Sequence, residues 1–124
     1  MTNARLRVGR IGEDHACRYL TQHGLVVLAR NCRTRYGEID AIALDRETLV
    51  FVEVKTMRDG SQAGPERPAL AVGPRKQMQI RRLARAWLAE HAPPRHQSLR
   101  FDVVGISLGP SDLPTAIDHL PDAF

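Results

Sequence analysis

Residues 37–55, which read GEIDAIALDRETLVFVEVK, carry the clearest structural signal in the sequence. Two apolar segments, 38–44 and 49–55, flank the polar sequence Asp45-Arg46-Glu47-Thr48. This pattern predicts two strands joined by a tight turn. Strands joined by so short a turn must be antiparallel. Apolar residues on both faces of 49–55 further indicate that this strand lies inside a sheet.

The flanking sequence predicts two helices and two more strands. Apolar residues recur at helical spacing over 8–23, and a second helix over 75–91 begins after a proline. The apolar stripe of the second helix consists of Ile80, Leu83, Ala84 and Trp87. The remaining segments are strands at 25–29 and 101–106, a turn at 33–37, a flexible Gly/Pro-rich loop at 59–74 and a loop-like tail.

The order of these elements predicts an α/β fold with an αβββαβ core. The helix over 75–91 is a crossover connection, so the strand at 101–106 should run parallel to the strand at 49–55. We therefore expect one mixed sheet flanked by helices. A chain of 124 residues has the usual size of one domain, and we expect residues 1–124 to form a single domain.

The composition excludes several classes of protein. Apolar residues make up 43% and charged residues 26%, which excludes a disordered or collagen-like chain. No apolar run approaches the roughly 18 residues of a membrane span, and no signal-peptide core follows the N-terminus. Cys17 and Cys32 form neither a zinc framework nor a disulfide scaffold. We expect a cytoplasmic protein that does not bind a membrane.

The net charge of +4 is unevenly distributed along the chain. Residues 1–35 and 67–100 carry net charges of +5 and +7, whereas residues 36–66 and 101–124 carry −4 each. An acidic centre between basic flanks suits a site that holds cations while its rim attracts a polyanion. Solubility charge on exposed helices is the alternative interpretation.

The spacing of the central hairpin places two acids opposite each other. With the turn centred between Arg46 and Glu47, the antiparallel register pairs Asp40 with Glu53. Directly opposed residues have Cβ atoms about 4.5–5.5 Å apart and side chains on one face. Lys55 lies two residues beyond Glu53 and therefore points to the same face.

Two opposed carboxylates repel each other, and a divalent cation offsets that repulsion. Asp40 and Glu53 would hold Mg²⁺ or Mn²⁺, with the carbonyl of Val54 as a further ligand. Such a metal polarises a phosphoryl group and makes hydroxide available near neutral pH, with Lys55 within reach of the phosphate. The alternative is an ordinary Glu–Lys ion pair on a solvated strand face, worth about 0–1 kcal/mol.

The choice of lysine adds to this argument. The chain has 18 basic residues, of which Lys55 and Lys76 are lysines and the rest arginines. Arginine is effectively always protonated, whereas lysine is a compact donor with an adjustable pKa. A lysine beside the acidic pair therefore indicates a specific role for Lys55, and the same argument applies more weakly to Lys76.

Several motifs resemble the YraN-type uncharacterised protein family. They are Gly12-Glu13, Arg30-Asn31, Gly37-Glu38-Ile39-Asp40, Phe51-Val52-Glu53-Val54-Lys55, Arg100-Phe101-Asp102-Val103-Val104 and Asp122-Ala123-Phe124. That family is placed in the PD-(D/E)xK nuclease superfamily, with a restriction-endonuclease-like fold and similarity to archaeal Holliday-junction resolvases. The resemblance implies that Asp40 and Glu53 are metal ligands and that Lys55 is the catalytic lysine.

The resemblance also implies that Glu13, on the first helix, reaches the site as an outer or third acidic ligand. The alternative for Glu13 is a first-turn acid that stabilises the helix dipole. Further basic residues are candidates for contacts with nucleic-acid phosphates, and Tyr36 is the one candidate for stacking on a base. These basic residues are Arg33, Arg35, Arg75, Lys76, Arg82 and Arg85. An ordinary solvated helix face is the alternative for those on the second helix.

Together these observations predict a Mg²⁺- or Mn²⁺-dependent endonuclease that acts on DNA rather than RNA, with branched or structured DNA as a candidate substrate. The first alternative is a catalytically weak or inactive nucleic-acid-binding module with the nuclease fold. The second is a partner-binding protein in which Asp40, Glu53 and Lys55 form a buried ion network. A homodimer is expected by analogy with branched-DNA resolvases.

Overall fold

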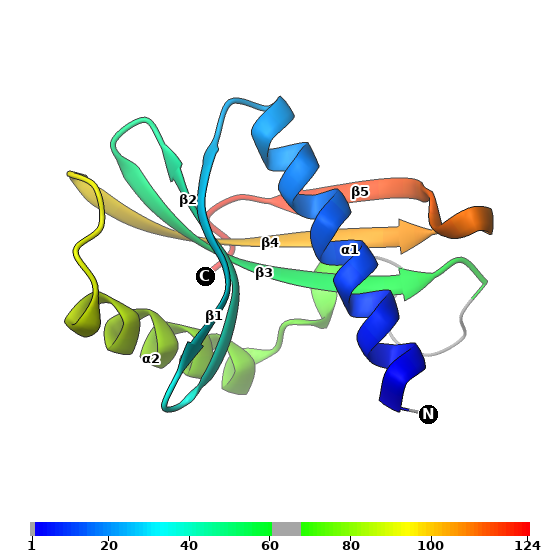
Figure 1. Cartoon of the computed structure of the whole chain (residues 1–124), viewed down its shortest axis with the longest axis horizontal. Helices are drawn as coiled ribbons and strands as arrows, with labels where there is room; N and C mark the ends of the chain where they lie inside the picture. Colours follow the sequence, from blue (N-terminus) through cyan, green and yellow to red (C-terminus); the bar gives the residue numbers. More distant parts are fainter. Residues whose placement is uncertain (1, 61–67) are drawn as a thin grey trace.

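A computed structural model describes residues 2–60 and 68–124 of the chain (Figure 1). Its helices are α1 (Thr2–Gln22) and α2 (Pro74–Glu90), with the short 3-10 segments η1 (Pro68–Ala71) and η2 (Pro110–Asp112). Its strands are β1 (Val26–Thr34), β2 (Gly37–Asp45), β3 (Thr48–Arg58), β4 (Ser98–Leu108) and β5 (Pro114–Leu120). In this part of the chain, no helix is long and apolar enough to cross a membrane.

The strands form one five-stranded sheet in the order β1-β2-β3-β4-β5. Neighbouring strands are antiparallel except β3 and β4, which run parallel because α2 carries the chain back between them. The order α1-β1-β2-β3-α2-β4 confirms the predicted αβββαβ core and its mixed sheet. Both strands of the predicted hairpin are present, joined by a two-residue turn at Arg46 and Glu47.

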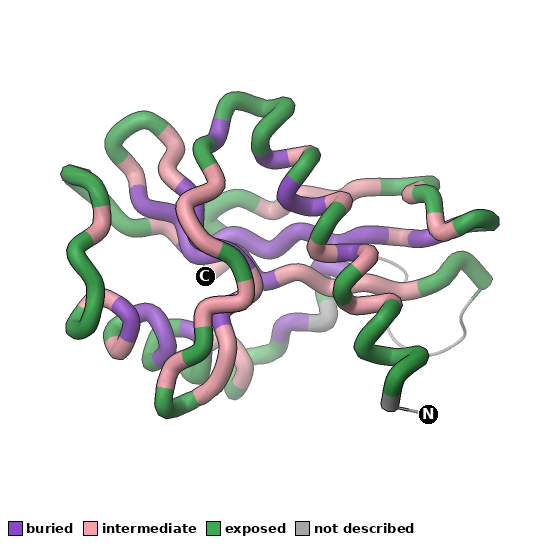
Figure 2. Tube along the Cα trace, viewed as in Figure 1, coloured by how far each residue is buried: buried purple, intermediate pink, exposed green. Residues whose placement is uncertain are grey.

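The central strand β3 is buried on both faces, which explains its nearly continuous apolar sequence. Leu49 and Phe51 belong to the core under α2, whereas Val50 and Val52 belong to the core under α1. The two helices therefore cover opposite faces of the sheet. Figure 2 shows the buried residues concentrated along the middle strands, between the two helices.

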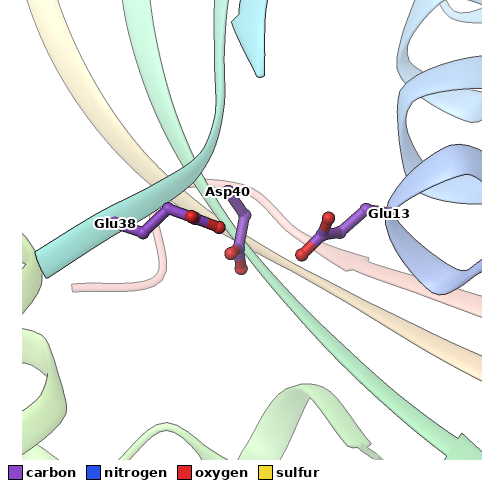
Figure 3. Close-up of side chains that lie close together, drawn as sticks. All are labelled: Glu13, Glu38 and Asp40. Carbon is purple, nitrogen blue, oxygen red and sulfur yellow. The ribbon is translucent and has the colours of Figure 1, made fainter. Parts of the chain in front are cut away.

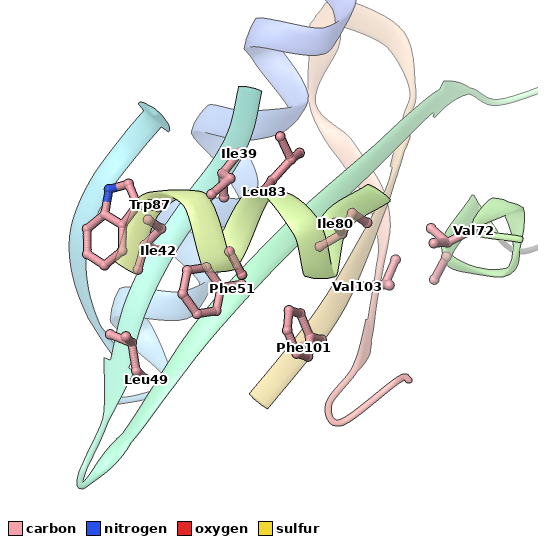
Figure 4. Packing of buried hydrophobic residues seen from close by; sticks show 12 residues of the cluster. Ile39, Ile42, Leu49, Phe51, Val72, Ile80, Leu83, Trp87, Phe101 and Val103 are labelled. Carbon is pink, nitrogen blue, oxygen red and sulfur yellow. The ribbon is translucent and has the colours of Figure 1, made fainter. Parts of the chain in front are cut away.

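The predicted apolar stripe of α2 is confirmed. Ile80, Leu83, Ala84 and Trp87 are the buried residues of this helix, and they pack over the α2 face of the sheet (Figure 4). The ring of Trp87 meets Phe51 edge to face, with centroids 6.0 Å apart. An aromatic pair of this kind adds about 0.5–1.5 kcal/mol beyond its buried area. Packing of this stripe holds α2 against the sheet, and it thereby sets the position of the first turn of α2 near β3.

The predicted strands at 49–55 and 101–106 are longer in the structure, as β3 and β4, and the largest boundary errors are in α1 and β1. Helix α1 begins at Thr2 rather than at residue 8, because its exposed first turns lack the apolar periodicity that the prediction used. Strand β1 extends to Thr34 rather than ending at residue 29, since its polar half still pairs with β2. The predicted turn at 33–37 is correspondingly reduced to Arg35 and Tyr36.

The prediction of a loop-like tail is also wrong, because the tail forms η2 and the edge strand β5. Strand β5 is tied to β4 by Asp102, which is fully buried. The Asp102 carboxylate accepts hydrogen bonds from Arg100 Nε at 2.8 Å, from His119 Nε2 at 2.7 Å and from the Asp122 backbone N–H at 3.0 Å. These partners supply the compensation that a buried charge requires.

The predicted flexible loop at 59–74 can be compared with the structure only in part, because residues 61–67 lie outside the described residues. Its last third is not a loop on the surface. Ala69 and Val72 are buried in the core under α2, and Pro74 begins α2 as the sequence predicted. This segment is therefore packed against the sheet before the helix starts.

Candidate active site

The candidate site lies where β2 and β3 separate. Their ladder runs from the pair Asp45–Thr48 to the pair Ala41–Val52, which confirms the predicted register. Asp40 and Glu53 are the next residues on the two strands, and β3 continues beside β4 as far as Arg58. On the edge of β3 that faces β2, the backbone here bonds to a side chain instead of a strand.

The Val54 backbone N–H donates to Asp40 Oδ2 at 2.8 Å. The N–H and C=O of one strand residue point to the same side of the strand. The carbonyl of Val54 therefore opens toward the side on which the Asp40 carboxyl lies. Asp40, Glu53 and the Val54 carbonyl, the three predicted metal ligands, thus come together at the end of the ladder.

Two more carboxylates approach Asp40 from other positions. Glu38 stands two residues before it on β2, and Glu13 reaches it from α1 (Figure 3). One oxygen of each of these three residues lies within 4.8 Å of the other two. The structure thus places Glu13 beside Asp40, and it adds Glu38, which was not among the predicted site residues.

A single amide group connects two of these acids. Asn31 Nδ2 donates to Glu13 Oε1 at 2.8 Å and to Glu38 Oε1 at 3.1 Å. Asn31 has a φ of 49°, in the left-handed region that asparagine tolerates better than most residues. An irregular position in β1 therefore links α1 to β2 at the site.

Two lysines approach the fourth acid. Lys55 Nζ lies 3.5 Å from Glu53 Oε2, which confirms that Lys55 and Glu53 share a face of β3. Lys76 Nζ, from the first turn of α2, lies 3.6 Å from the same oxygen. Glu53 itself is only 7% exposed. A nearly buried carboxylate is therefore compensated from two different elements.

The pKa of Asp40 is raised from its ordinary value of 3.8 to about 7, mainly because the carboxyl is buried. The charge of Glu53, the approach of Glu13 and a side-chain hydrogen bond with Glu53 contribute to this rise, while the Val54 N–H opposes it. These are the effects expected when carboxylates are crowded together with no cation between them. A bound cation would favour the ionised form of Asp40.

Helix α1 approaches β3 very closely next to the site. A Cβ atom added to Gly12 would lie 1.8 Å from Thr56 Oγ1 and 2.7 Å from Thr56 Cβ. Glycine is therefore required here for packing rather than for its backbone freedom. This contact brings the next residue, Glu13, to the acidic cluster.

A cleft of about 490 Å³ opens beside these groups. Ala4, Arg5 and Val8 of α1 line one side of it, while Asp40 and Lys55 are among the residues that line the other. Its volume falls within the usual range of ligand sites. The cleft gives a substrate access to the acidic groups and to Lys55.

The predicted phosphate-binding residues occupy different places. Arg35 and Arg82 both approach Tyr36 at the tip of the β1–β2 hairpin, with guanidinium carbons 5.3 and 3.9 Å from the ring centroid. Arg33 Nη2 lies 3.6 Å from Glu38 Oε2, at the border of the acidic cluster. Arg75 and Arg85 are exposed on α2. Lys76 differs from this group because it reaches Glu53.

The residues of the site fit a divalent cation that prefers oxygen ligands. Four carboxyl groups and two ammonium groups carry a formal charge of −2 when all are ionised, and the exposed guanidinium groups of Arg10 and Arg33 lie 3.8 and 3.6 Å from Glu13 and Glu38. Mg²⁺ and Mn²⁺ both bind carboxylate and carbonyl oxygens, which are the groups that meet at Asp40. The charge of Glu53 contributes, after burial, to the raised pKa of Asp40, and a bound cation would offset this contribution.

Sequence reasoning missed two contributors, Glu38 and Asn31. Glu38 lies two residues from Asp40, so the period of a strand could have placed both on one face. The role of Asn31 had no comparable signal, because it depends on a positive φ and on partners in two distant segments. For Lys76 the scarcity of lysine was the available signal.

Comparison with known sequences places the chain among related proteins. The profile of the uncharacterised protein family UPF0102 matches residues 12–106. A UPF0102 protein of Rhodococcus opacus is 50% identical over 120 residues, covering 96% of this chain and 97% of the relative. One of Syntrophotalea carbinolica is 44% identical over 124 residues, covering 100% of this chain and 96% of the relative. The chain therefore belongs to the uncharacterised protein family UPF0102, the YraN-type family that its motifs resemble.

Proposed function

We propose that this protein is a divalent-metal-dependent endonuclease that hydrolyses phosphodiester bonds in DNA. The observation that carries the proposal is the convergence of Asp40, Glu53 and Lys55 where β2 leaves β3. Paired acids beside a lysine are suited to metal-assisted phosphodiester hydrolysis. The same residues carry the resemblance to the PD-(D/E)xK superfamily, in which we propose to place the protein.

In this proposal Asp40 and Glu53 hold Mg²⁺ or Mn²⁺ through carboxylate oxygens. The carbonyl of Val54 is a third ligand, and Glu13 is an additional acid at the border of the site. When bound, the cation polarises the phosphoryl group and lowers the pKa of water. Neutralising the acids would also relieve the repulsion that, together with burial, raises the pKa of Asp40.

The residues of the chain bind and orient the substrate. The ammonium group of Lys55 donates a hydrogen bond to a phosphate oxygen as negative charge develops there. The oxygen of a water molecule attacks phosphorus, and the bond from phosphorus to the leaving sugar oxygen breaks with its electron pair. The water supplies the hydroxyl group on phosphorus and the proton on the leaving oxygen, so one water is consumed per bond.

We propose that the substrate is DNA rather than RNA, and that this DNA is branched or structured. Arg35 of the hairpin tip and Arg82 of α2 meet at Tyr36 on one side of the site. Arg5 of α1 lines the cleft on another side. Each of these arginines is suited to bind phosphates. A homodimer would present two such sites to a branched substrate, and light scattering with and without DNA tests this part of the proposal.

The experiment that tests the function is cleavage of a labelled nucleic-acid panel with Mg²⁺, Mn²⁺ or EDTA. The panel contains duplex DNA, single-stranded DNA, a flap, a four-way junction and RNA. Asp40→Ala and Lys55→Ala are compared with the wild type, and Arg95→Gln is the control because Arg95 is exposed beyond the far end of α2.

We expect cleavage that requires metal and disappears in the Asp40 and Lys55 variants but not in the control. Cleavage that persists in both variants would show that the site is wrong or that the activity comes from a contaminant. Salt-sensitive binding without cleavage would instead favour an inactive nucleic-acid-binding module. The absence of both cleavage and binding would overturn the proposal.

A further inference from the structure

The two lysines of this chain meet at one carboxylate oxygen. Among 18 basic residues, Lys55 and Lys76 are the only lysines. They stand 21 positions apart, on β3 and α2, yet their Nζ atoms lie 3.5 and 3.6 Å from Glu53 Oε2. Every other basic position in the chain is arginine.

The surroundings of Lys76 differ from those of the other basic residues of α2. Its side chain is 36% exposed and reaches across to β3, whereas Arg75, Arg82 and Arg85 are exposed to solvent. The apolar stripe of α2 fixes the helix against the sheet and so sets the position of Lys76. Lys76 therefore belongs spatially to the acidic site rather than to the outer phosphate-binding surface.

We infer that Lys76 is a second lysine of the reaction centre, which contacts the phosphate under attack and not a distant phosphate of the substrate. The inference rests on the proposed function. Glu53 needs one positive group to balance its charge, and Lys55 already provides it. A cation on Glu53 would repel both ammonium groups, and a phosphate oxygen would provide the second lysine with a new acceptor.

The chemistry of lysine supports this assignment. Lysine carries a compact ammonium on a flexible four-carbon chain, so it can turn from a carboxylate to a nearby phosphate oxygen. The planar fork of arginine suits a fixed bidentate contact. A structural ion pair is a weaker explanation, because partly exposed ion pairs contribute little to stability. Lys76 thus acts in this proposal as a hydrogen-bond donor to charge that develops during the reaction.

The test uses Lys76→Met, which removes the charge but keeps the length of the side chain, and Lys76→Arg, which keeps the charge. Arg95→Gln is the control for the loss of one positive charge. Each variant is assayed on the best substrate of the panel, with either oxygen or sulfur at the non-bridging position of the scissile phosphate. The measurements are kcat, KM, melting temperature and the salt dependence of DNA binding.

We expect Lys76→Met to lower kcat by about 100-fold, the usual loss when one hydrogen-bond donor to a developing charge is removed. KM and the slope of log affinity against log salt should stay near the wild-type values. The rate penalty of sulfur substitution should be smaller in Lys76→Met than in the wild type, since the donor is already absent. Lys76→Arg should be intermediate in kcat.

Calorimetric titration with Mn²⁺ provides a readout that does not depend on activity. Lys76→Met should bind Mn²⁺ at least as tightly as the wild type, because a positive charge beside Glu53 has been removed. Weaker Mn²⁺ binding together with a lower melting temperature would show that Lys76 only supports Glu53, and this result would overturn the inference.

Two other outcomes would also overturn it. An unchanged kcat with a raised KM and a salt slope reduced by about one would make Lys76 an ordinary phosphate contact. After this outcome, and after weaker Mn²⁺ binding, the proposed nuclease would stand, since the wild type still cleaves. A wild-type protein that cleaves no member of the panel would instead remove the proposed function and this inference together.

Discussion

Asp40 is the residue of the site at which burial and a neighbouring negative charge oppose ionisation. Burial and the neighbouring Glu53 raise its pKa to about 7, although the Val54 N–H stabilises the ionised form. Without a cation, the folded protein therefore holds a proton on Asp40 at pH values where the unfolded chain has lost it. This difference links folding stability to pH in a direction opposite to that of a salt-bridged acid.

We expect the unfolding free energy in EDTA to decrease as pH rises from about 4 to 7 through this group, by at most about 4 kcal/mol. Well below pH 4, Asp40 is protonated in both states and contributes no difference. Asp40→Asn retains an acceptor for the Val54 N–H and removes the charge. The variant should therefore be more stable than the wild type at pH 8 and similar at pH 4.

Thermal denaturation between pH 4 and 8, followed by circular dichroism, checks this prediction. Mg²⁺ at pH 8 should raise the melting temperature of the wild type and have little effect on Asp40→Asn, because binding to the folded state stabilises it. Equal pH dependence in the two proteins would show that Asp40 is ionised in the folded state throughout.

Asn31 provides a second test at the scale of one residue. Asn31→Ala removes the two hydrogen bonds to Glu13 and Glu38 and places alanine at a φ of 49°. Asn31→Gly removes the same bonds but tolerates that backbone, so it is the matched control. We expect both variants to bind Mn²⁺ more weakly in calorimetry. The alanine variant should also have an unfolding free energy about 1 kcal/mol lower than that of the glycine variant. Wild-type Mn²⁺ affinity in Asn31→Gly would show that the amide does not organise the site.

At the scale of elements, the position of α1 depends on its contact with β3. Gly12→Ala would force its methyl group into Thr56, whose Cβ is fixed to the backbone and cannot rotate away. We expect a loss of about 1–3 kcal/mol in unfolding free energy and weaker Mn²⁺ binding, because Glu13 moves with the helix. Chemical denaturation and calorimetry measure the two effects.

Gly9→Ala is the control on the same helix, because a Cβ at Gly9 meets no atom within 4 Å. It should stabilise the protein by up to about 1 kcal/mol through helix propensity. If Gly12→Ala were as stable as Gly9→Ala, α1 would be packed on β3 less tightly than the structure shows.

The elements also show what could be predicted from the sequence. The β2–β3 hairpin was predictable because its turn, its register and its apolar segments are all local. Strand β5 was not, because its polar residues find their partners in β4, with His119 bonded to Asp102. The acidic pair followed from the register, whereas the approach of Glu13 was implied by the family resemblance and that of Lys76 required the packing of α2.

In the whole molecule, the fold places acidic residues at the centre of the site and basic residues around it. Acidic residues of the central segment lie where β2 and β3 separate. Basic residues from both flanks of the sequence surround them on α1, the β1–β2 hairpin and α2. Figure 1 shows the hairpin tip beside α2 and away from α1, and Arg82 of α2 meets Tyr36 at this tip. Such an arrangement attracts a polyanion while its centre binds a cation.

This arrangement predicts how DNA binding depends on salt. Arg35 and Arg82 both lie against Tyr36 at the hairpin tip, outside the acidic cluster. The double variant Arg35→Gln/Arg82→Gln should therefore lose about two phosphate contacts and reduce the slope of log affinity against log salt by about two. Fluorescence anisotropy at several salt concentrations measures this slope, with Arg95→Gln as the control that should keep the wild-type value. Since these residues lie outside the reaction centre, KM should rise while kcat is unchanged; an unchanged slope would place the DNA on another face of the molecule.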